Sequence, residues 1–134
     1  MPGYSGTPLP KKLGIKAGFH VFLGDAPPEV RTELKAALAG CELTRDGKQS
    51  VDFLMLFTKS KKDLSDNFKQ LSGQLTLAGM FWVCWPKRSS GVATDLNENI
   101  VREIGLAAGL VDVKVCAVTE VWSGLKFVRR LKDR

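Results

Sequence analysis

Two patterns of apolar residues alternate along the chain, and together they predict its elements. Continuous apolar runs at residues 19–25, 51–58 and 80–85 are typical of buried strands. The first two runs are each followed by a stretch, at 27–39 and 60–75, in which apolar residues recur every three or four positions. This spacing places them on one face of a helix. Strand, helix and strand in succession predict parallel strands joined by a right-handed crossover.

Capping residues predict where the helices begin. Asp25 stands before the proline pair 27–28, and we expect it to cap the first helix. Ser60 and Asp63 have the serine-x-x-acid spacing that starts a helix. We expect a third helix to begin near Asp95, because apolar residues keep helical spacing after it until a glycine ends the pattern.

The last third of the chain changes to an alternating pattern. Residues 111–118 and 124–130 are each expected to form a strand, and the dipeptide Ser123-Gly124 predicts the turn of an antiparallel hairpin. A weaker strand is expected at 41–44. The elements predict an α/β fold: a three-layer α/β/α sandwich whose mostly parallel, Rossmann-like sheet is closed by a C-terminal antiparallel hairpin.

The chain length of 134 residues fits one domain. Residues 1–18, rich in Gly, Pro and Ser, are expected to be an extended N-terminal arm, and residues 19–134 a single Rossmann-like domain. The apolar side chains of the arm, such as Tyr4 and Leu13, are expected to pack across the domain or onto a second copy. A homo-oligomer is therefore one of the arrangements the sequence allows.

Composition narrows the class of protein. The chain is 44% hydrophobic and 25% charged, as in ordinary globular domains. It has no apolar run long enough for a membrane span and no signal peptide, so we expect a cytoplasmic protein with no membrane partner. The cysteines at 41, 84 and 116 are far apart and His20 is the single histidine, so neither a disulfide framework nor a metal site is predicted. No cofactor is predicted either.

The formal net charge of +6 comes from short clusters of lysine and arginine. These clusters do not alternate with aromatic residues, as they do on a surface that binds single strands. A solvated basic surface is therefore favoured, and weak binding of nucleic acid is the less favoured alternative.

The stretch CWPKRSSGVATDL, residues 84–96, carries the most distinctive polar chemistry. In an open α/β sheet, ligands bind beyond the carboxyl ends of parallel strands, and three such ends are expected to meet here. The backbone amides of the third helix would also favour an anion. The alternative is a structural loop in which Asp95 occupies those amides. The candidate ligand residues are Gly24, Lys59, Lys87, Arg88, Ser90, Gly91 and Thr94.

The tryptophans give a similar choice between packing and binding. Trp82 and Trp85 are expected on opposite faces of their strand, so at least one lies beneath a helix. Trp85 and Trp122 are candidate aromatic residues at the rim of the site, and we expect Trp122 to be partly exposed. Packing is favoured over a stacking surface. No serine or cysteine has a base beside it, so no catalytic residue is predicted.

The order of elements is similar to a shortened form of the fold of S-adenosylmethionine-dependent methyltransferases. In that fold the cofactor lies on a glycine-rich turn after the first strand. Here the turn LGDAPPEV, residues 23–30, has one glycine, and its two prolines remove two backbone donors, which predicts poor binding of the cofactor. Asp46 is the candidate acidic residue for the ribose, but with Gly47 it is more typical of a turn.

Three longer strings carry a second resemblance: GYSGTPLPKKLGIKAG, WPKRSSGVATDLNENIVRE and GLVDVKVCAVTEVWSGLKFVRR. They resemble a family of small bacterial proteins known as domain of unknown function family 3052. The resemblance implies one compact cytosolic domain and no particular reaction. The leading interpretation of the sequence is a non-catalytic binding module for a small anionic ligand or a protein partner. A small methyltransferase-like transferase is the alternative.

Overall fold

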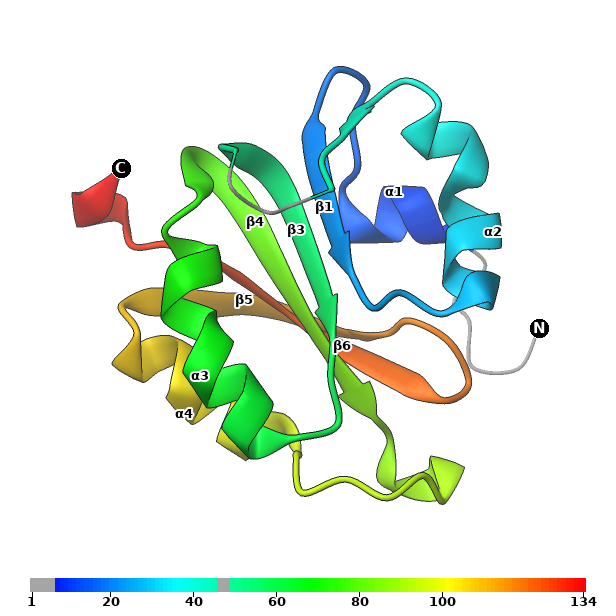
Figure 1. The fold of residues 1–134 in the computed structure, drawn as a ribbon, viewed down its shortest axis with the longest axis vertical. Helices are drawn as coiled ribbons and strands as arrows, with labels where there is room; N and C mark the ends of the chain where they lie inside the picture. Colours follow the sequence, from blue (N-terminus) through cyan, green and yellow to red (C-terminus); the bar gives the residue numbers. More distant parts are fainter. Residues whose placement is uncertain (1–6, 46–48) are drawn as a thin grey trace.

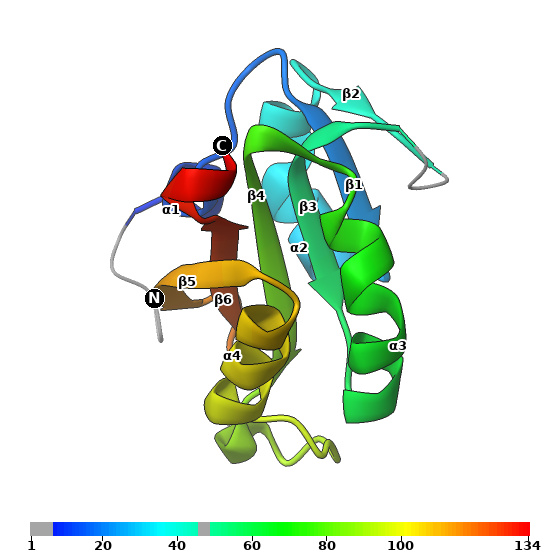
Figure 2. The ribbon, with the colours of Figure 1, turned by 90° about the vertical axis from the view of Figure 1, so that its left-hand side faces the viewer.

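The computed structural model describes residues 7–45 and 49–134, which form a six-stranded sheet with helices on both faces (Figures 1 and 2). The strands lie in the order β2-β1-β3-β4-β6-β5; the first four are parallel, and β6 is antiparallel to both neighbours. This confirms the predicted fold class. The strands are β1 His20–Gly24, β2 Glu42–Leu43, β3 Val51–Phe57, β4 Leu75–Pro86, β5 Leu110–Ala117 and β6 Trp122–Arg129. The helices are α1 Leu9–Leu13, α2 Pro28–Leu38, α3 Lys61–Ser72 and α4 Glu98–Ala107, with short 3-10 turns η1 Arg88–Ser90 and η2 Leu131–Asp133.

The sheet separates two hydrophobic clusters. One cluster joins α1 and α2 to one face, and the other joins α3 and α4 to the opposite face (Figure 2). Strand β3 supplies both, since Phe53 and Met55 face the first cluster and Leu54 the second. Trp82 and Trp85 divide in the same way, which confirms that they point to opposite faces.

The path of the chain creates a switch point between β1 and β3. From β1 the chain passes through α2 to β2 on one side, and then returns to β3 on the other side of β1. Helix α2 covers one face of the sheet and α3 the other. The carboxyl ends of β1 and β3 therefore diverge into loops above a crevice, where α/β proteins of this type bind ligands.

Two helix boundaries differ from the prediction. Asp25 does not cap α2; it has a left-handed backbone with φ 57°, and Pro27 is the N-cap with no side-chain cap. Helix α3 starts as predicted, because the Ser60 hydroxyl accepts a hydrogen bond from Asp63 N–H. It ends earlier, however, and Leu75 already belongs to β4, where it pairs with β3.

The predicted hairpin exists, but its turn lies elsewhere. Ser123 and Gly124 lie within β6, opposite Ala117 and Cys116, so the prediction that they form the turn is wrong. Residues 118–121 connect the strands. Gly124 is required by packing, because a Cβ at this position would lie 2.9 Å from Val118 Cγ2.

The N-terminal segment is not wholly extended, as α1 shows. Leu9 and Leu13 are buried in the α1–α2 cluster, and the indole N–H of Trp82 donates a hydrogen bond of 2.9 Å to the carbonyl of Leu13. A short helix with buried leucines therefore replaces the expected extended chain, while the expected packing across the domain holds for these residues. Tyr4 and the predicted turn at Asp46-Gly47 lie outside the described residues.

A partly buried carboxylate, that of Asp52, joins the beginnings of three strands. Asp52 in β3 accepts hydrogen bonds from His20 N–H at 2.9 Å and from the Thr76 hydroxyl at 3.0 Å. Partial burial alone would raise the pKa of Asp52, but these hydrogen bonds and the nearby His20 ring lower it below the ordinary value of 3.8.

Among the described residues, every helix is too short or too polar to cross a membrane.

Candidate functional site

Two hollows open at the carboxyl edge of the sheet. The first, which we call the switch-point hollow, has a volume of about 410 Å³ and lies at the ends of β1 and β3. It is lined by Asp25, Phe57, Thr58, Lys59, Ser60, Asp63 and Trp122. The second, the loop hollow, has a volume of about 620 Å³ and lies along the connection from β4 to α4. Its lining includes Trp85, Lys87, Arg88, Gly91, Thr94, Asp95 and Glu98.

Two hydrogen bonds join the walls of these hollows. The Thr94 hydroxyl donates to the Lys59 carbonyl at 2.6 Å, and the Asp95 carboxylate accepts from Lys61 N–H at 2.7 Å. The loop after β4 is thereby fixed to the loop after β3 and to the start of α3. The structure therefore brings Lys59, Lys87, Arg88, Gly91 and Thr94 to one edge, as the sequence predicts.

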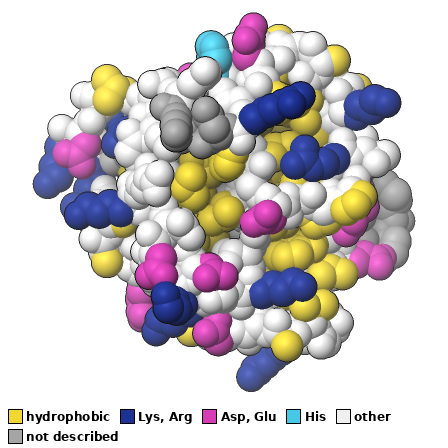
Figure 3. Space-filling view, viewed as in Figure 1, with side chains coloured by type: hydrophobic (Ala, Val, Ile, Leu, Met, Phe, Trp, Pro, Cys, Tyr) yellow, Lys and Arg dark blue, Asp and Glu magenta, His cyan; other side chains and the backbone are white. Residues whose placement is uncertain are grey.

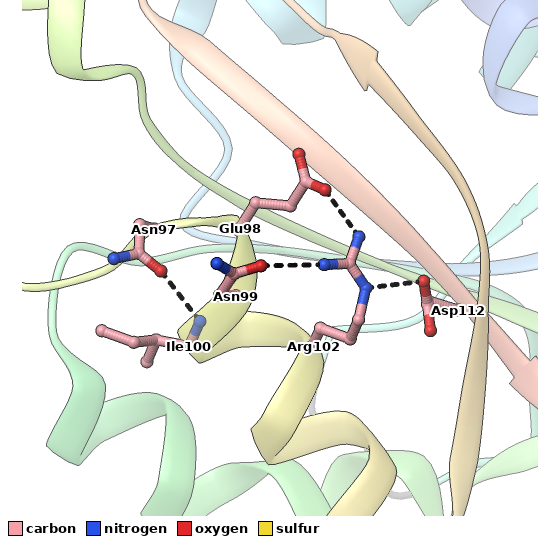
Figure 4. Close-up of polar contacts among 6 residues, drawn as sticks. All are labelled: Asn97, Glu98, Asn99, Ile100, Arg102 and Asp112. Atoms are coloured by element: carbon pink, nitrogen blue, oxygen red, sulfur yellow. Dashed lines mark hydrogen bonds and ion pairs between the residues drawn. The ribbon is translucent and has the colours of Figure 1, made fainter.

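Asp95 caps a different helix from the expected one. It serves the amino end of α3, whereas α4 begins at Glu98 and is capped by Asn97, whose Oδ1 accepts from Ile100 N–H at 2.9 Å (Figure 4). The prediction that Asp95 caps α4 is wrong. In the sequence, Asp95 and Asn97 both stand before the helical pattern, and both are good capping residues. Only the fold shows that the chain bends toward α3 between them.

The hydroxyl groups of the loop are engaged within the loop. Ser90 donates to the Lys87 carbonyl at 2.6 Å and accepts from Val92 N–H at 3.2 Å. Thr94, besides its bond to Lys59, accepts from Leu96 N–H at 3.1 Å. A hydroxyl has one proton to donate. These two side chains therefore shape the loop, and the donors we expected them to offer to a ligand are already used.

The cationic side chains of the edge are not used in this way. Lys59, Lys87 and Arg88 make no side-chain hydrogen bond or ion pair with another described residue. Gly91 has a left-handed backbone with φ 74°, and a Cβ there would meet nothing within 4 Å, so the loop is open at this point. The charge of the loop hollow is therefore available to a ligand at Lys87 and Arg88.

Two carboxylates line the loop hollow: that of Glu98 forms an ion pair, and that of Asp95 accepts a backbone N–H. Arg102 donates to Glu98 at 2.6 Å and to Asp112 at 2.8 Å, and also to Asn99 at 3.2 Å (Figure 4). The hydrogen bonds that Arg102 donates to Glu98, and then to Asp112, raise its pKa above its already high ordinary value. This network fixes α4 to β5. Because one guanidinium serves two carboxylates, the network still carries a net negative charge beside the hollow.

The two tryptophans of the site are walls and not exposed rims. Trp85 is 5% exposed and lines the loop hollow, and Trp122 is 9% exposed and lines the switch-point hollow. Trp122 packs edge-on against Phe57 with ring centroids 5.1 Å apart. The expectation that Trp122 is partly exposed is therefore wrong, because its ring completes the hydrophobic cluster under α2.

Gly24 lies in a third hollow, of about 460 Å³, on the α3 face of the sheet. Phe22, Leu56 and Leu71 line it, and Figure 3 shows apolar side chains exposed in the middle of this face. A Cβ on Gly24 would lie 2.8 Å from Leu56 Cδ1. The Leu56 side chain would have to shift to admit a Cβ here, and the hollow around Gly24 is lined by none of the lysines with which Gly24 was grouped.

Asp25 is the residue of the site that the sequence interpretation missed. It was assigned as a helix cap, yet it lines both the switch-point hollow and the hollow around Gly24. The proline pair could have indicated this. Proline is common at the first position of a helix, and with Pro28 there the cap is Pro27, so Asp25 lies too early in the chain to cap the helix. Among the described residues, no three His, Cys, Asp or Glu side chains are arranged to hold a metal ion.

Several solved structures with a similar fold are methyltransferases. The magnesium protoporphyrin IX methyltransferase from Synechocystis, solved with bound SAM, has a TM-score of 0.60 and 11% identity, over 91% of this chain and 74% of that chain. A methyltransferase from Pyrococcus furiosus has a TM-score of 0.55 and 11% identity, over 94% and 84%. The fibrillarin pre-rRNA processing protein of Methanococcus jannaschii has a TM-score of 0.55 and 14% identity, over 92% and 69%.

These neighbours correct the leading interpretation of the sequence. A non-catalytic binding module for an anion or a protein partner was favoured there, with a methyltransferase-like enzyme as the alternative. The neighbours include methyltransferases solved with bound SAM or SAH, and they favour the alternative. At identities of 9% and 11% the likeness establishes the shared fold alone.

The family comparison agrees with the strings quoted from the sequence. A search among curated proteins gave no match. The family described as "Protein of unknown function (DUF3052)" matches residues 11–131, which include both hollows and the whole sheet. The chain belongs to this family.

Proposed function

We propose that this protein is a small methyltransferase-type enzyme that takes a ligand like S-adenosylmethionine in the switch-point hollow and a methyl acceptor in the loop hollow. One observation carries the proposal: Asp25 and Lys59 line the same hollow at the switch point between β1 and β3. Structural neighbours with this fold and with bound SAM or SAH support it.

The charges of the switch-point hollow fit the amino-acid part of such a ligand. That part carries one ammonium and one carboxylate group. Asp25 would bind the ammonium and Lys59 the carboxylate, as charge-assisted hydrogen bonds. The Thr58 hydroxyl is close to the Ser60 backbone and adds polar groups at the same end of β3. When bound, the ligand supplies an electrophilic methyl group.

The turn after β1 departs from the glycine-rich pattern, and this makes ligand binding depend more on the side chains of Asp25 and Lys59. Pro27 and Pro28 have no N–H groups, so the start of α2 offers fewer backbone donors than usual. Binding then depends on Asp25 and Lys59 to a greater extent than on the backbone. This is why we choose these two residues for the test.

The loop hollow supports an acceptor that carries an anionic group. Lys87 and Arg88 form no ion pair with another described residue and offer their positive charge there, while the Glu98 carboxylate is held by Arg102. The open space beside Gly91 gives an acceptor access from solvent.

We also propose a cytoplasmic location, since the three cysteines are free thiols, as is usual in a reducing compartment.

Isothermal titration calorimetry with S-adenosylmethionine tests the proposal. We expect the wild type to bind, and we expect Asp25→Asn and Lys59→Gln each to lose about tenfold to a hundredfold in affinity, because a charge-assisted hydrogen bond contributes about 1.5–3 kcal/mol. Asp66→Asn and Lys69→Gln change the same charges on the exposed side of α3 and serve as controls. Lys87→Gln should leave this affinity unchanged, because Lys87 lines the other hollow. A wild type that shows no binding heat would refute the proposal.

A further inference from the structure

A group of lysines faces the N-terminal helix, outside both hollows. Lys114 in β5 stands directly opposite Lys126 in β6. Lys126 is also opposite Trp82 in β4, whose side chain lies in the α1–α2 cluster, so Lys126 is on the face that α1 covers. Like charges directly opposite each other on neighbouring strands destabilise a sheet. The pairing of Lys114 with Lys126 therefore costs stability unless a counter-charge is present.

Lys114 and Lys126 lie against the segment that holds α1, and Lys16 follows this helix in the chain. The Lys114 ammonium donates to the Lys12 carbonyl at 3.1 Å, at the end of α1. A Cβ on Gly14, which follows α1, would lie 3.9 Å from the Lys126 ammonium nitrogen. Lys16 follows two residues later and is exposed. Partial burial, and then the charges of Lys114 and Lys16, lower the pKa of Lys126.

No carboxylate compensates these charges within the part of the chain that the structure describes. Lys16, Lys114 and Lys126 form no ion pair with a described aspartate or glutamate. The half-buried Lys126 makes no hydrogen bond to another described residue, although burying a cation without a partner is unfavourable. The position is therefore one where an external anion would be stabilising.

We propose that Lys16, Lys114 and Lys126, which we call the lysine patch, bind an anion that carries two or more phosphate groups. Lysine ammonium groups are compact charges that suit phosphate oxygens, and a patch with several of them fits neighbouring phosphates better than a single carboxylate. A soluble polyphosphate compound and the backbone of RNA share this chemistry. None of the three lysines lines the switch-point or loop hollow, so the site is separate from the proposed methyltransferase site.

Binding of two probes at low salt tests this proposal: inorganic tripolyphosphate by calorimetry and a fluorescent single-stranded RNA 12-mer by anisotropy. The variant is Lys16→Gln with Lys126→Gln, which leaves the hydrogen bond of Lys114 to α1 intact. The control is Lys35→Gln with Lys69→Gln, which removes the same charge from α2 and α3. We expect the patch variant to lose at least tenfold in affinity for the probe that the wild type binds, and the control less than twofold.

The two probes also distinguish the sources of phosphate. If RNA is the ligand, the plot of log affinity against log salt should be less steep for the patch variant than for the wild type. The size of its negative slope should fall by about 1.4, because each of the two lost contacts to a single strand contributes about 0.7. Binding of tripolyphosphate without RNA would assign a small polyphosphate compound. A loss in the control equal to that in the patch variant, or a wild type that binds neither probe, would overturn the proposal. Retained binding of S-adenosylmethionine by the patch variant shows that it is folded and that the two sites are independent.

Discussion

Replacing Asp95 by alanine should weaken the amino end of α3 and leave α4 unchanged. The Asp95 carboxylate accepts from Lys61 N–H at 2.7 Å, a short bond to an ionised acceptor. A capping residue of this kind contributes about 1 kcal/mol to stability. With an unfolding entropy of about 2.1 cal/mol/K per residue, a loss of this size lowers the melting temperature of a chain of 134 residues by about 4 °C. The Ser60 cap on Asp63 N–H limits the damage, because it serves a second amide of the same turn.

The test is amide hydrogen exchange followed residue by residue, with Asn97→Ala as the matched variant. Asp95→Ala should speed exchange in the first turn of α3, and Asn97→Ala should do so in the first turn of α4. Since the two side chains serve different helices, their effects on the free energy of unfolding should add in the double variant. Faster exchange at Ile100 in Asp95→Ala, without a change at Lys61, would refute this reasoning and restore the cap assignment made from the sequence.

Two further predictions concern packing and pH. Gly105→Ala should lower the free energy of unfolding, measured with urea, by about 1–3 kcal/mol, because a Cβ on this residue of α4 would overlap the ring of Phe127 in β6. An unchanged free energy of unfolding would contradict the close helix–sheet contact. Partial burial opposes the effect, but the hydrogen bonds from His20 and Thr76 still lower the pKa of Asp52, so its contribution to stability should be fully present above pH 3.8 and be lost as the pH falls through its lower folded-state pKa. Melting temperatures of wild type and Asp52→Asn should therefore converge at low pH, and a constant difference from pH 7 to pH 2 would contradict the assignment.

The sequence predicted the strands well because buried parallel strands leave a simple pattern. The continuous apolar run of β3 has side chains packed on both faces, and this requirement is visible in the residues themselves. The turn of the hairpin was wrong because a serine–glycine pair has two explanations. Gly124 also meets a packing need against Trp82 and Cys84 in β4, and local turn chemistry cannot show such a contact.

The position of the lysines at one edge of the sheet was predicted for a related reason, whereas Asp25 and the hydrogen bonds that join the loops were not predicted. Lys59 and Lys87 follow strand ends, which the topology brings together at one edge. The hydrogen bond of Thr94 to Lys59 and that of Asp95 to Lys61 each join residues more than thirty positions apart. Their existence depends on the path of the loop, which the pattern of apolar residues does not specify.

The hydrogen bonds of Thr94 and Asp95 also determine how costly ligand binding is at this edge. They fix the loop after β4 to α3, so the wall between the two hollows is already ordered in the free protein. A ligand that enters either hollow does not have to immobilise a flexible flap, and the entropic penalty that usually accompanies such ordering is met during folding. The edge is thus preorganised, and its affinity should depend on charge and shape more than on conformational adjustment.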